Sequence, residues 1–381
     1  MPNRLALVTG FPGFIGSRLV GGLLAADDEL RIAAIVEGRM AERAGAAATG
    51  IDPERIEVLE GDIGERRLGL SDSDYERLVG ETTTVFHLAA IYDLSVPLEI
   101  AQRVNVEGTG NVLELCARCE RLERLNYVST AYVAGLRRGV VYEHELSLGQ
   151  EFKNHYESTK FQAELWVRTY MDRVPVTVYR PAIVVGDSRT GETQKFDGPY
   201  YMLRVISRAV RAGTPIPQFG RSAAPFNVVP VDFVVDAMRA AAGDPAAAGE
   251  TFHLVDPEPV PAVEVLRLLS REYAGRDPAY RVPPGVVEAA LAFEPVRGMF
   301  GGAPREGIRY LNHPVRFDTR RAGDVLSRHG LQCPRFGEYA AAIVSFFREH
   351  EDDPAFAGGA AAPAPPRVAV SRRPRRAGAQ A

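Results

Sequence analysis

The chain has 381 residues, 46% of them hydrophobic, which is enough to form a substantial core in one large α/β domain or in two lobes. Its 45 basic and 49 acidic residues give a net charge of −4, a balance that does not favour nucleic acid as a partner. No apolar leader precedes the first predicted strand, and no run of about 18 uncharged apolar residues occurs. We therefore expect a soluble, cytoplasmic protein without a transmembrane segment.

The first predicted elements are a strand, a glycine turn and a helix. The apolar run at 5–8 predicts a buried strand, and from Ile15 onward apolar residues recur on one helical face. Gly10, Gly13 and Gly16 lie between them. Residues without a Cβ let backbone N–H groups approach a pyrophosphate, and the helix N-terminus then faces its negative charge. This segment predicts a dinucleotide site, with a purely structural glycine turn as the alternative.

Strand-like runs alternate with helix-like segments through the first half of the chain. The strands are predicted at 5–9, 31–36, 56–59, 84–88, 125–129 and 176–179. Helices are predicted between them, including 75–79 after a capping signal at 71–74, and 106–119. The alternation predicts an α/β fold, with a Rossmann-type, doubly wound parallel sheet covered by helices on both faces.

The second half of the chain has a different texture. Gly and Pro are dense from 191 to 225, and further elements are predicted as a strand at 251–254 and helices at 201–212, from 232, and at 262–272, 286–293, 319–326 and 339–350. We expect residues 1–190, with a returning segment near 228–256, to form the NAD(P)-binding Rossmann domain. Residues 191–350 are expected to form a smaller C-terminal lobe that binds the substrate.

Residues 354–381 consist mainly of Ala, Pro, Gly and Arg. Such a segment cannot bury enough apolar surface to offset the entropy lost on ordering, so it predicts a disordered tail. Contact of its arginines with an anionic membrane or RNA is the less favoured alternative.

Cys116 and Cys119 have a C-x-x-C spacing, but they come late in a predicted helix and no second pair or nearby histidine accompanies them. We interpret them as buried thiols on a helix face, and the sequence predicts no metal site.

Tyr156 and Lys160 are candidates for acid–base chemistry. Residues four apart share one face of a helix, so their side chains can converge. A phenol with a pKa of about 10 is a poor acid or base near neutrality, and a nearby cation favours its ionised form. Thr130, or Ser129 as its substitute, follows the fifth predicted strand and can hold a substrate oxygen. Y-x-x-x-K alone is common on helix surfaces, but its place downstream of the glycine turn favours catalysis.

Short motifs follow one another in a set order. They are Thr-Gly-x-x-Gly-x-x-Gly at 9–16, Gly-Asp-Ile at 61–63, Leu-Gly-Leu-Ser at 68–71, His-Leu-Ala-Ala at 87–90, Asn-Val-Glu-Gly-Thr at 105–109, Tyr-Val-Ser-Thr-Ala-Tyr-Val at 127–133, Tyr156 with Lys160, Arg-Pro at 180–181, Val-Gly-Asp-Ser at 185–188 and Pro-Val-Asp-Phe at 230–233. In these motifs the chain resembles the extended short-chain dehydrogenase/reductases. Within that superfamily it resembles the fatty acyl-CoA reductase and thioester reductase-like branch, also called male sterility, NAD-binding.

The resemblance implies a nicotinamide cofactor along one edge of the sheet. From the pyrophosphate through the adenine to the nicotinamide, the implied contacts are Gly10, Gly13, Phe14, Ile15, Gly16, Asp62, Ile63, Ala89, Ala90, Pro181 and Ile183. It also implies that Thr130, Tyr156 and Lys160 form the catalytic set, with Tyr156 and Lys160 reaching the cofactor as well.

The choice of cofactor depends on the residues after the second predicted strand. Glu37 is placed to bond the ribose 2′-hydroxyl of NAD(H). Members of the branch often carry a basic residue there that pairs with the 2′-phosphate of NADP(H), and Arg39 and Arg43 are candidates for that role. The sequence leaves NAD(H) and NADP(H) evenly balanced.

Other residues of these motifs have structural interpretations. We expect Asn105 and Asp232 to be helix N-caps and His87 to be a core histidine with its hydrogen bonds satisfied. Asp62 has turn capping as its alternative role.

The resemblance implies an NAD(P)-dependent oxidoreductase of lipid metabolism. It reduces an acyl thioester, as acyl-CoA or on an acyl carrier protein, or the derived aldehyde. One alternative is a sterol or sugar dehydrogenase, epimerase or dehydratase; another is a non-catalytic nicotinamide-binding protein, against which the Thr–Tyr–Lys set counts. No adenylation or carrier domain precedes the first strand, so the acyl group is expected on free CoA or a separate carrier. The superfamily frequently forms homodimers.

Overall fold

The computed structural model describes residues 4–92, 96–219, 224–283, 285–286, 307–311 and 313–356. The helix predicted at 286–293, apart from its first residue, and the tail predicted beyond residue 356 lie outside the described residues.

A seven-stranded parallel sheet forms the centre of the molecule, with the strand order β11-β7-β5-β4-β1-β2-β3. Its strands are β1 (Arg4–Thr9), β2 (Leu30–Val36), β3 (Ile56–Glu60), β4 (Thr82–His87), β5 (Arg124–Val128), β7 (Val176–Pro181) and β11 (Thr251–Leu254). The chain builds outward from β1 to β3, then crosses to β4 on the other side of β1. The predicted Rossmann-type topology is confirmed, with its switch point between β1 and β4.

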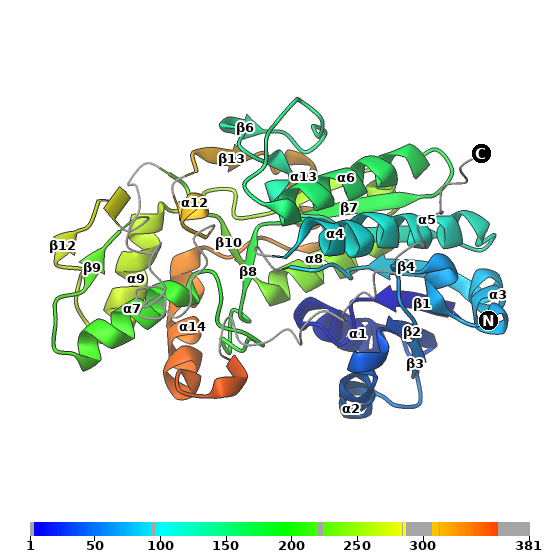
Figure 1. Cartoon of the computed structure of the whole chain (residues 1–381), viewed down its shortest axis with the longest axis horizontal. Helices are drawn as coiled ribbons and strands as arrows, with labels where there is room; N and C mark the ends of the chain where they lie inside the picture. The colour runs from blue at the N-terminus through cyan, green and yellow to red at the C-terminus, as the bar shows by residue number, and fades with distance from the viewer. Residues whose placement is uncertain are drawn as a thin grey trace, which may run out of the picture.

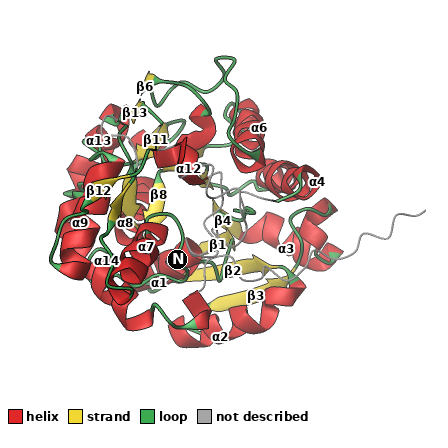
Figure 2. Ribbon diagram, turned by 60° about the vertical axis from the view of Figure 1, so that its left-hand side comes forward, coloured by secondary structure: helices red, strands yellow, loops and turns green. Residues whose placement is uncertain are grey.

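Helices cover both faces of this sheet (Figures 1 and 2). One face packs against α1 (Phe14–Ala26), α2 (Ala41–Ile51) and α8 (Val231–Gly243). The other packs against α3 (Asp72–Glu81), α5 (Gly108–Arg118) and α6 (His155–Tyr170). Apolar residues therefore fill both faces of the sheet, as a buried parallel sheet requires.

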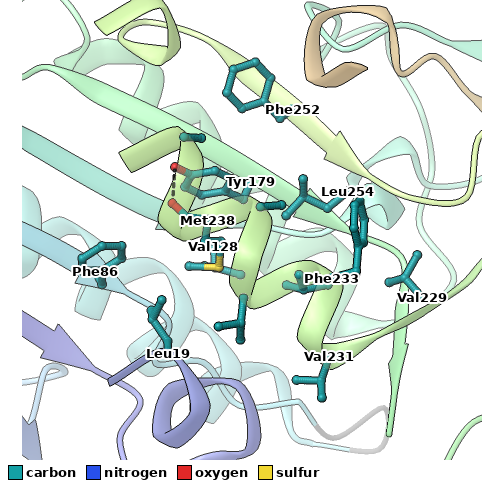
Figure 3. Close-up of a cluster of buried hydrophobic side chains, with 14 of the residues drawn as sticks. Leu19, Phe86, Val128, Tyr179, Val229, Val231, Phe233, Met238, Phe252 and Leu254 are labelled. Carbon is teal, nitrogen blue, oxygen red and sulfur yellow. Dashed lines mark hydrogen bonds between the residues drawn. The ribbon is translucent and has the colours of Figure 1, made fainter. Parts of the chain in front are cut away.

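Alternation along β1 shows how one strand serves both layers. Ala6 and Val8 belong to the cluster under α1 and α8, whereas Leu5 and Leu7 belong to the cluster under α3 and α5. Figure 3 shows the first cluster, in which Leu19 of α1 and Met238 of α8 lie over Phe86, Val128 and Tyr179 of the sheet. This packing fixes α1, and with it the glycine turn at its start.

The C-terminal part adds a separate hydrophobic cluster built from α7 (Tyr200–Arg211), α9 (Ala262–Ala274) and α14 (Phe336–His350). α13 (Arg320–Leu326), although it lies within 191–350, packs with α8 and β11 in the sheet core. At α13 the grouping of buried residues therefore differs from the predicted division into residues 1–190 and 191–350.

Short strands join segments that are distant in sequence. The pairs are β8 (Ile183–Val185) with β10 (Val228–Pro230), β9 (Pro217–Gln218) with β12 (Tyr280–Arg281), and β6 (Gly139–Val141) with β13 (Val315–Phe317). The short helices α4 (Leu98–Ala101) and α12 (Gly307–Leu311) complete the described elements used below. No helix in the described part of the chain is long and apolar enough to cross a membrane.

Candidate active site

The glycine turn after β1 folds tightly upon itself. Gly10 has φ +92°, and its carbonyl accepts a hydrogen bond from the Gly13 N–H at 2.9 Å. A Cβ on Gly13 would lie 2.7 Å from the Gly10 oxygen, and one on Gly16 only 2.5 Å from it. Side chains at these positions are therefore excluded by contact within the turn itself.

The N-terminus of α1 is open to an anion. Gly13 is its N-cap, no side chain caps it, and its first turn holds no acidic residue. The first backbone N–H groups and the positive end of the helix dipole consequently face the turn without a competing carboxylate. A helix N-terminus without a side-chain cap after a glycine turn is chemistry that fits the pyrophosphate of a dinucleotide.

The segment after β4 lies against the same turn. A Cβ on Gly10 would come within 2.9 Å of the Ala89 nitrogen, which itself donates to the Thr9 hydroxyl at 3.2 Å. The structure thus brings together Gly10 and Ala89, as expected from the motifs. Ala90 comes directly after Ala89 on this segment and is partly exposed.

His87, at the end of β4, is a satisfied core histidine, as predicted. Its Nδ1 pairs with the Thr9 hydroxyl at 2.7 Å and its Nε2 with the Thr109 hydroxyl at 3.0 Å. Burial, helped by the nearby charge of Lys160, lowers the pKa of His87 to about 3. The ring is therefore neutral and part of the wall of the site.

Two charged residues come after β2 at the same edge of the sheet. The Glu37 carboxylate and the Arg39 guanidinium form an ion pair at 2.7 Å, and both side chains are nearly half exposed. Arg43 instead donates to the side chain of Gln194 at 3.4 Å. Opposite charges are thus available together where a ribose of the expected cofactor would lie.

Asp62 and Ile63 come after β3 beside them. Asp62 accepts from the Gly64 N–H at 2.8 Å, so it caps a turn, and it also pairs with Arg103. Ile63 is buried against Gly108, where a Cβ would come within 2.9 Å of the isoleucine side chain. This pair therefore shapes the edge of the site, although Asp62 is already engaged by Arg103.

The catalytic candidates meet where β5 ends and α6 begins. Thr130 comes after β5, accepts from the Tyr132 N–H at 3.3 Å and donates to the Pro181 carbonyl at 3.5 Å. Its side chain also lies near enough to Tyr156 on α6 to oppose the rise in the pKa of the tyrosine that burial causes. Asn154 caps α6 through a bond from the Glu157 N–H at 3.0 Å. Thr130 and Tyr156 thus come from separate elements to one place.

Burial governs the protonation of this set. It raises the pKa of Tyr156, and the hydroxyl that opposes the rise belongs to Thr130 rather than to Lys160. Lys160 is buried, donates to the Val128 carbonyl at 2.7 Å and lies 4.5 Å from the centre of the Tyr127 ring. Burial lowers the pKa of Lys160 to about 7, against the opposing charge of Glu164.

Ser129 is committed to another partner. Its hydroxyl donates to Glu164 at 2.6 Å, and Glu164 forms a fully buried ion pair with Arg180 at 2.6 Å. Because the Ser129 hydroxyl is held by a buried carboxylate, the geometry favours Thr130 over Ser129 as the hydroxyl that holds a substrate oxygen. Sequence analysis missed the Glu164–Arg180 pair; its signal was a carboxylate one helical turn after Lys160 and an arginine within an apolar strand.

Two predictions of helix capping are wrong. Asn105 lies inside the helical segment Gln102–Glu107, where its buried amide accepts from the Ile91 N–H at 2.8 Å and donates to the Thr159 hydroxyl at 3.0 Å. Asp232 lies within the first turn of α8, after the N-cap Pro230, and binds the Ser188 N–H and hydroxyl at 2.9 and 2.6 Å. Both side chains tie loops to helices around the site.

Sequence analysis also missed aromatic and charged residues around Tyr156. The ring of Tyr92 lies edge-on to that of Tyr156, with centroids 5.1 Å apart. Lys153 and Glu157 form a buried ion pair at 3.1 Å just before and within α6. Tyr310 of α12 accepts a hydrogen bond from Asn154 at 2.9 Å. No motif carried a signal for Tyr310, because its contact spans almost half of the chain.

Cys116 and Cys119 are buried on or just after α5, and burial raises the pKa of both thiols. Within the described ranges, no group of three or more His, Cys, Asp or Glu side chains is arranged to hold a metal ion.

Known proteins with similar sequences include reductases and peptide synthetases. The family model described as male sterility protein matches residues 8–238. The nonribosomal peptide synthetase asaC of Aspergillus flavus is 27% identical over 274 residues, which cover 66% of this chain and 26% of that protein. The fatty acyl-CoA reductase wat of Drosophila melanogaster is 26% identical over 282 residues, 64% of this chain and 54% of that protein.

Among solved structures, the terminal R domain from the myxalamid PKS-NRPS pathway is 27% identical, with a TM-score of 0.77 and 92% of each chain covered. The UDP-glucuronic acid 4-epimerase from Bacillus cereus, solved with NAD, has a TM-score of 0.63 at 18% identity over 91% of this chain and 97% of that one, and shares the fold. The chain spans about a quarter of asaC and about half of wat.

Proposed function

Because the chain belongs to the male sterility protein family, a branch of the extended short-chain dehydrogenases/reductases, we propose that it reduces an acyl thioester, or the derived aldehyde, with NAD(P)H. The observation that carries this proposal is that Thr130, held after β5 by its hydrogen bonds with Pro181 and Tyr132, lies near Tyr156 of α6, in a chain whose glycine turn leads into a helix N-terminus that no side chain caps. Support for the thioester comes from relatives named fatty acyl-CoA reductase and nonribosomal peptide synthetase.

A bound reduced nicotinamide would supply the hydride. The fit of the glycine turn to a pyrophosphate supports Gly10, Gly13, Gly16 and the first backbone N–H groups of α1 as its anchor. Lys160, fixed by the Val128 carbonyl one helical turn from Tyr156, is proposed to hold the nicotinamide ribose.

The two hydroxyls act on the carbonyl oxygen of the substrate. In our proposal Thr130 and Tyr156 donate hydrogen bonds to this oxygen as negative charge develops on it, and Tyr156 then gives up its proton. Because burial raises the pKa of Tyr156, the phenol is protonated at neutral pH and ready to donate. This state suits the direction of reduction.

The nature of the substrate determines the product. With an acyl thioester, the protonated product is a hemithioacetal, which releases the thiol to leave an aldehyde; a second round gives the alcohol. The chain needs no covalent intermediate for this sequence. The proposed donors of the acyl group are CoA and a carrier protein.

The residues after β2 support the use of both cofactors. Glu37 suits the 2′-hydroxyl of NADH, and Arg39 suits the 2′-phosphate of NADPH. The two form an ion pair with each other at 2.7 Å, so each charge is partly neutralised by its neighbour. We propose that neither cofactor is rejected.

An assay with NADH and NADPH in parallel tests the proposal. Purified protein is mixed with acyl-CoAs or aldehydes and the reduced cofactor, and with sterol or sugar alcohols and the oxidised cofactor, while the absorbance of the reduced cofactor is followed. We expect oxidation of the cofactor with thioesters or aldehydes, and Tyr156→Phe should lower kcat by about 100-fold or more because the proton donor is lost.

Tyr170→Phe is the matched control, since it removes a hydroxyl at the other end of α6. Unchanged turnover in Tyr156→Phe would mean that the proposed proton donor is wrong. Turnover of sterol or sugar alcohols alone would contradict the proposed substrate class.

A further inference from the structure

The small sheet formed by β6 and β13 presents an outer face rich in arginine. Alternate residues of a strand point to the same side, so Arg138, Val140 and Tyr142 share one side along β6 and its ends. Val140 pairs in register with Arg316 of β13, and both are exposed. The guanidinium of Arg320 lies 5.5 Å from the centre of the Tyr142 ring. We call these five residues the basic face.

The basic face also contains two exposed hydrophobic side chains. They are Val140 and Tyr142, which are 48% and 37% exposed. Aromatic residues and arginine together are typical of the centre of a protein interface.

The charge of the basic face contrasts with that of the chain. The full sequence has a net charge of −4, whereas the basic face contains three arginines. The carboxylates beside them are largely buried or paired: Asp318 pairs with Arg320 at 2.8 Å and is only 13% exposed, Glu145 accepts from the Tyr142 N–H at 3.0 Å and pairs with Arg137 at 2.6 Å, and Glu143 is buried. A positive surface on an acidic protein favours an acidic partner.

The inner side of the same sheet leads to the active site. Val141, Val315 and Phe317 are buried there. The ring of Phe317 lies edge-on to that of Tyr132, with centroids 5.9 Å apart, and the Tyr132 N–H binds the Thr130 hydroxyl. The basic face is therefore the outside of the layer that covers the segment after Thr130. Figure 1 shows β6 and β13 side by side at the edge of the molecule.

We propose that the basic face docks an acidic carrier protein, a separate folded chain that delivers the acyl thioester. This inference rests on the proposed function. An exposed two-stranded face with arginines around a tyrosine and a valine is suited to contact with the surface of a folded protein. A small ligand such as CoA is expected instead in a concave site, and membrane surfaces are bound mainly by helices that insert an apolar face.

The test compares one acyl group on two supports. The substrates are an acidic acyl carrier protein loaded with the acyl group through phosphopantetheine, and the N-acetylcysteamine thioester of the same acid. The double variant Arg138→Glu/Arg316→Glu reverses two charges of the basic face. We expect kcat/KM with the loaded carrier to fall about tenfold or more, and kcat/KM with the small thioester to stay unchanged.

The loss should shrink at high salt, because exposed charges are screened. The matched control is Arg31→Glu/Arg173→Glu, which reverses two exposed charges at the amino ends of the sheet strands, one early in β2 and one just before β7. We expect the control to keep its kcat/KM with both substrates.

Three results would overturn the docking proposal: equal losses with both substrates, no loss with the carrier, or no turnover of the carrier by a protein that reduces the small thioester. Binding to anionic vesicles that only the basic-face variant loses would assign the face to a membrane and also overturn it. Failure of every thioester with the unaltered protein would instead contradict the proposed function.

Discussion

At the scale of single residues, the site is controlled by how deeply its titratable groups are buried. Burial keeps Tyr156 protonated and shifts the pKa of Lys160 down to about 7. The same effect makes His87 neutral. The Val128 carbonyl and Glu164 stabilise the ammonium of Lys160 against this effect of burial. Because the pKa of Lys160 is still about 7, its charge depends on pH near neutrality.

The burial of Lys160 predicts a pH-dependent stability. An unfolded lysine has a pKa of about 10.4. Between the folded and unfolded values the unfolded chain binds a proton that the folded chain does not, so the cost of burying Lys160 fades as pH rises. The free energy of unfolding of Lys160→Met should therefore drop relative to the unaltered protein between about pH 7 and pH 10.

Urea denaturation across this pH range measures the difference. Lys195→Met serves as control, because the Lys195 side chain is 50% exposed. A difference between Lys160→Met and the unaltered protein that stays constant with pH would contradict the assigned shift.

The positions of site residues could be predicted from the sequence where a local pattern determines them. The glycine turn and the Tyr156–Lys160 spacing depend on neighbours within a few residues, and the structure places the turn before α1 and both residues on α6. Their catalytic and cofactor-binding roles stay predictions. Asn105 and Asp232 were misassigned as caps, because their partners Ile91 and Ser188 come from other segments. The Glu164–Arg180 pair likewise exists only after β7 has packed on α6.

At the scale of elements, the start of α6 is clamped from two sides. The Lys153 ammonium donates to the Gly135 carbonyl at 2.8 Å and pairs with Glu157 at 3.1 Å, both side chains being fully buried. Asn154 caps α6 and reaches Tyr310 of α12. Tyr156 lies between Asn154 and Glu157 in the first turn of α6. These contacts, which we call the clamp, therefore restrict the position of its hydroxyl.

The buried ion pair predicts a strong penalty for removing one charge. Lys153→Met leaves the Glu157 carboxylate buried without its cation and should lower the free energy of unfolding by about 3–5 kcal/mol. The double variant Lys153→Met/Glu157→Gln should recover part of this loss, because the uncompensated charge is gone. Chemical denaturation of both variants measures these effects.

Lys195→Met again supplies the comparison, since its 3.8 Å pair with Asp197 is partly exposed and should contribute less than about 1 kcal/mol. Equal losses for Lys153→Met and Lys195→Met would refute the clamp.

The long elements were predictable because hydrophobic periodicity identifies them. The seven strands of the main sheet and the helices α1, α3, α5 and α6 all lie where the patterns predicted them. The short strands β6, β8, β9, β10, β12 and β13 were not predicted. Each has two or three residues and depends on a partner far along the chain, so no local period marks it.

At the scale of the whole molecule, the segments that follow the carboxyl ends of the central strands and the C-terminal elements meet around Tyr156. β4 ends at His87, Thr130 comes after β5, and Tyr156 lies on α6. α12 and β13 reach the same region from the C-terminal part, through Tyr310 and Phe317. This convergence supports a substrate approaching from the side of the lobe. A cytoplasmic location and a homodimer stay predictions.

Transfer of deuterium tests the central claim most directly. Reduced cofactor deuterated at both C4 positions of the nicotinamide is incubated with the protein and an acyl-CoA, and the products are examined by mass spectrometry. We expect deuterium at the former carbonyl carbon of the aldehyde, and a second deuterium there in any alcohol. Oxidised cofactor accompanied by products without deuterium at that carbon would contradict hydride transfer to the carbonyl.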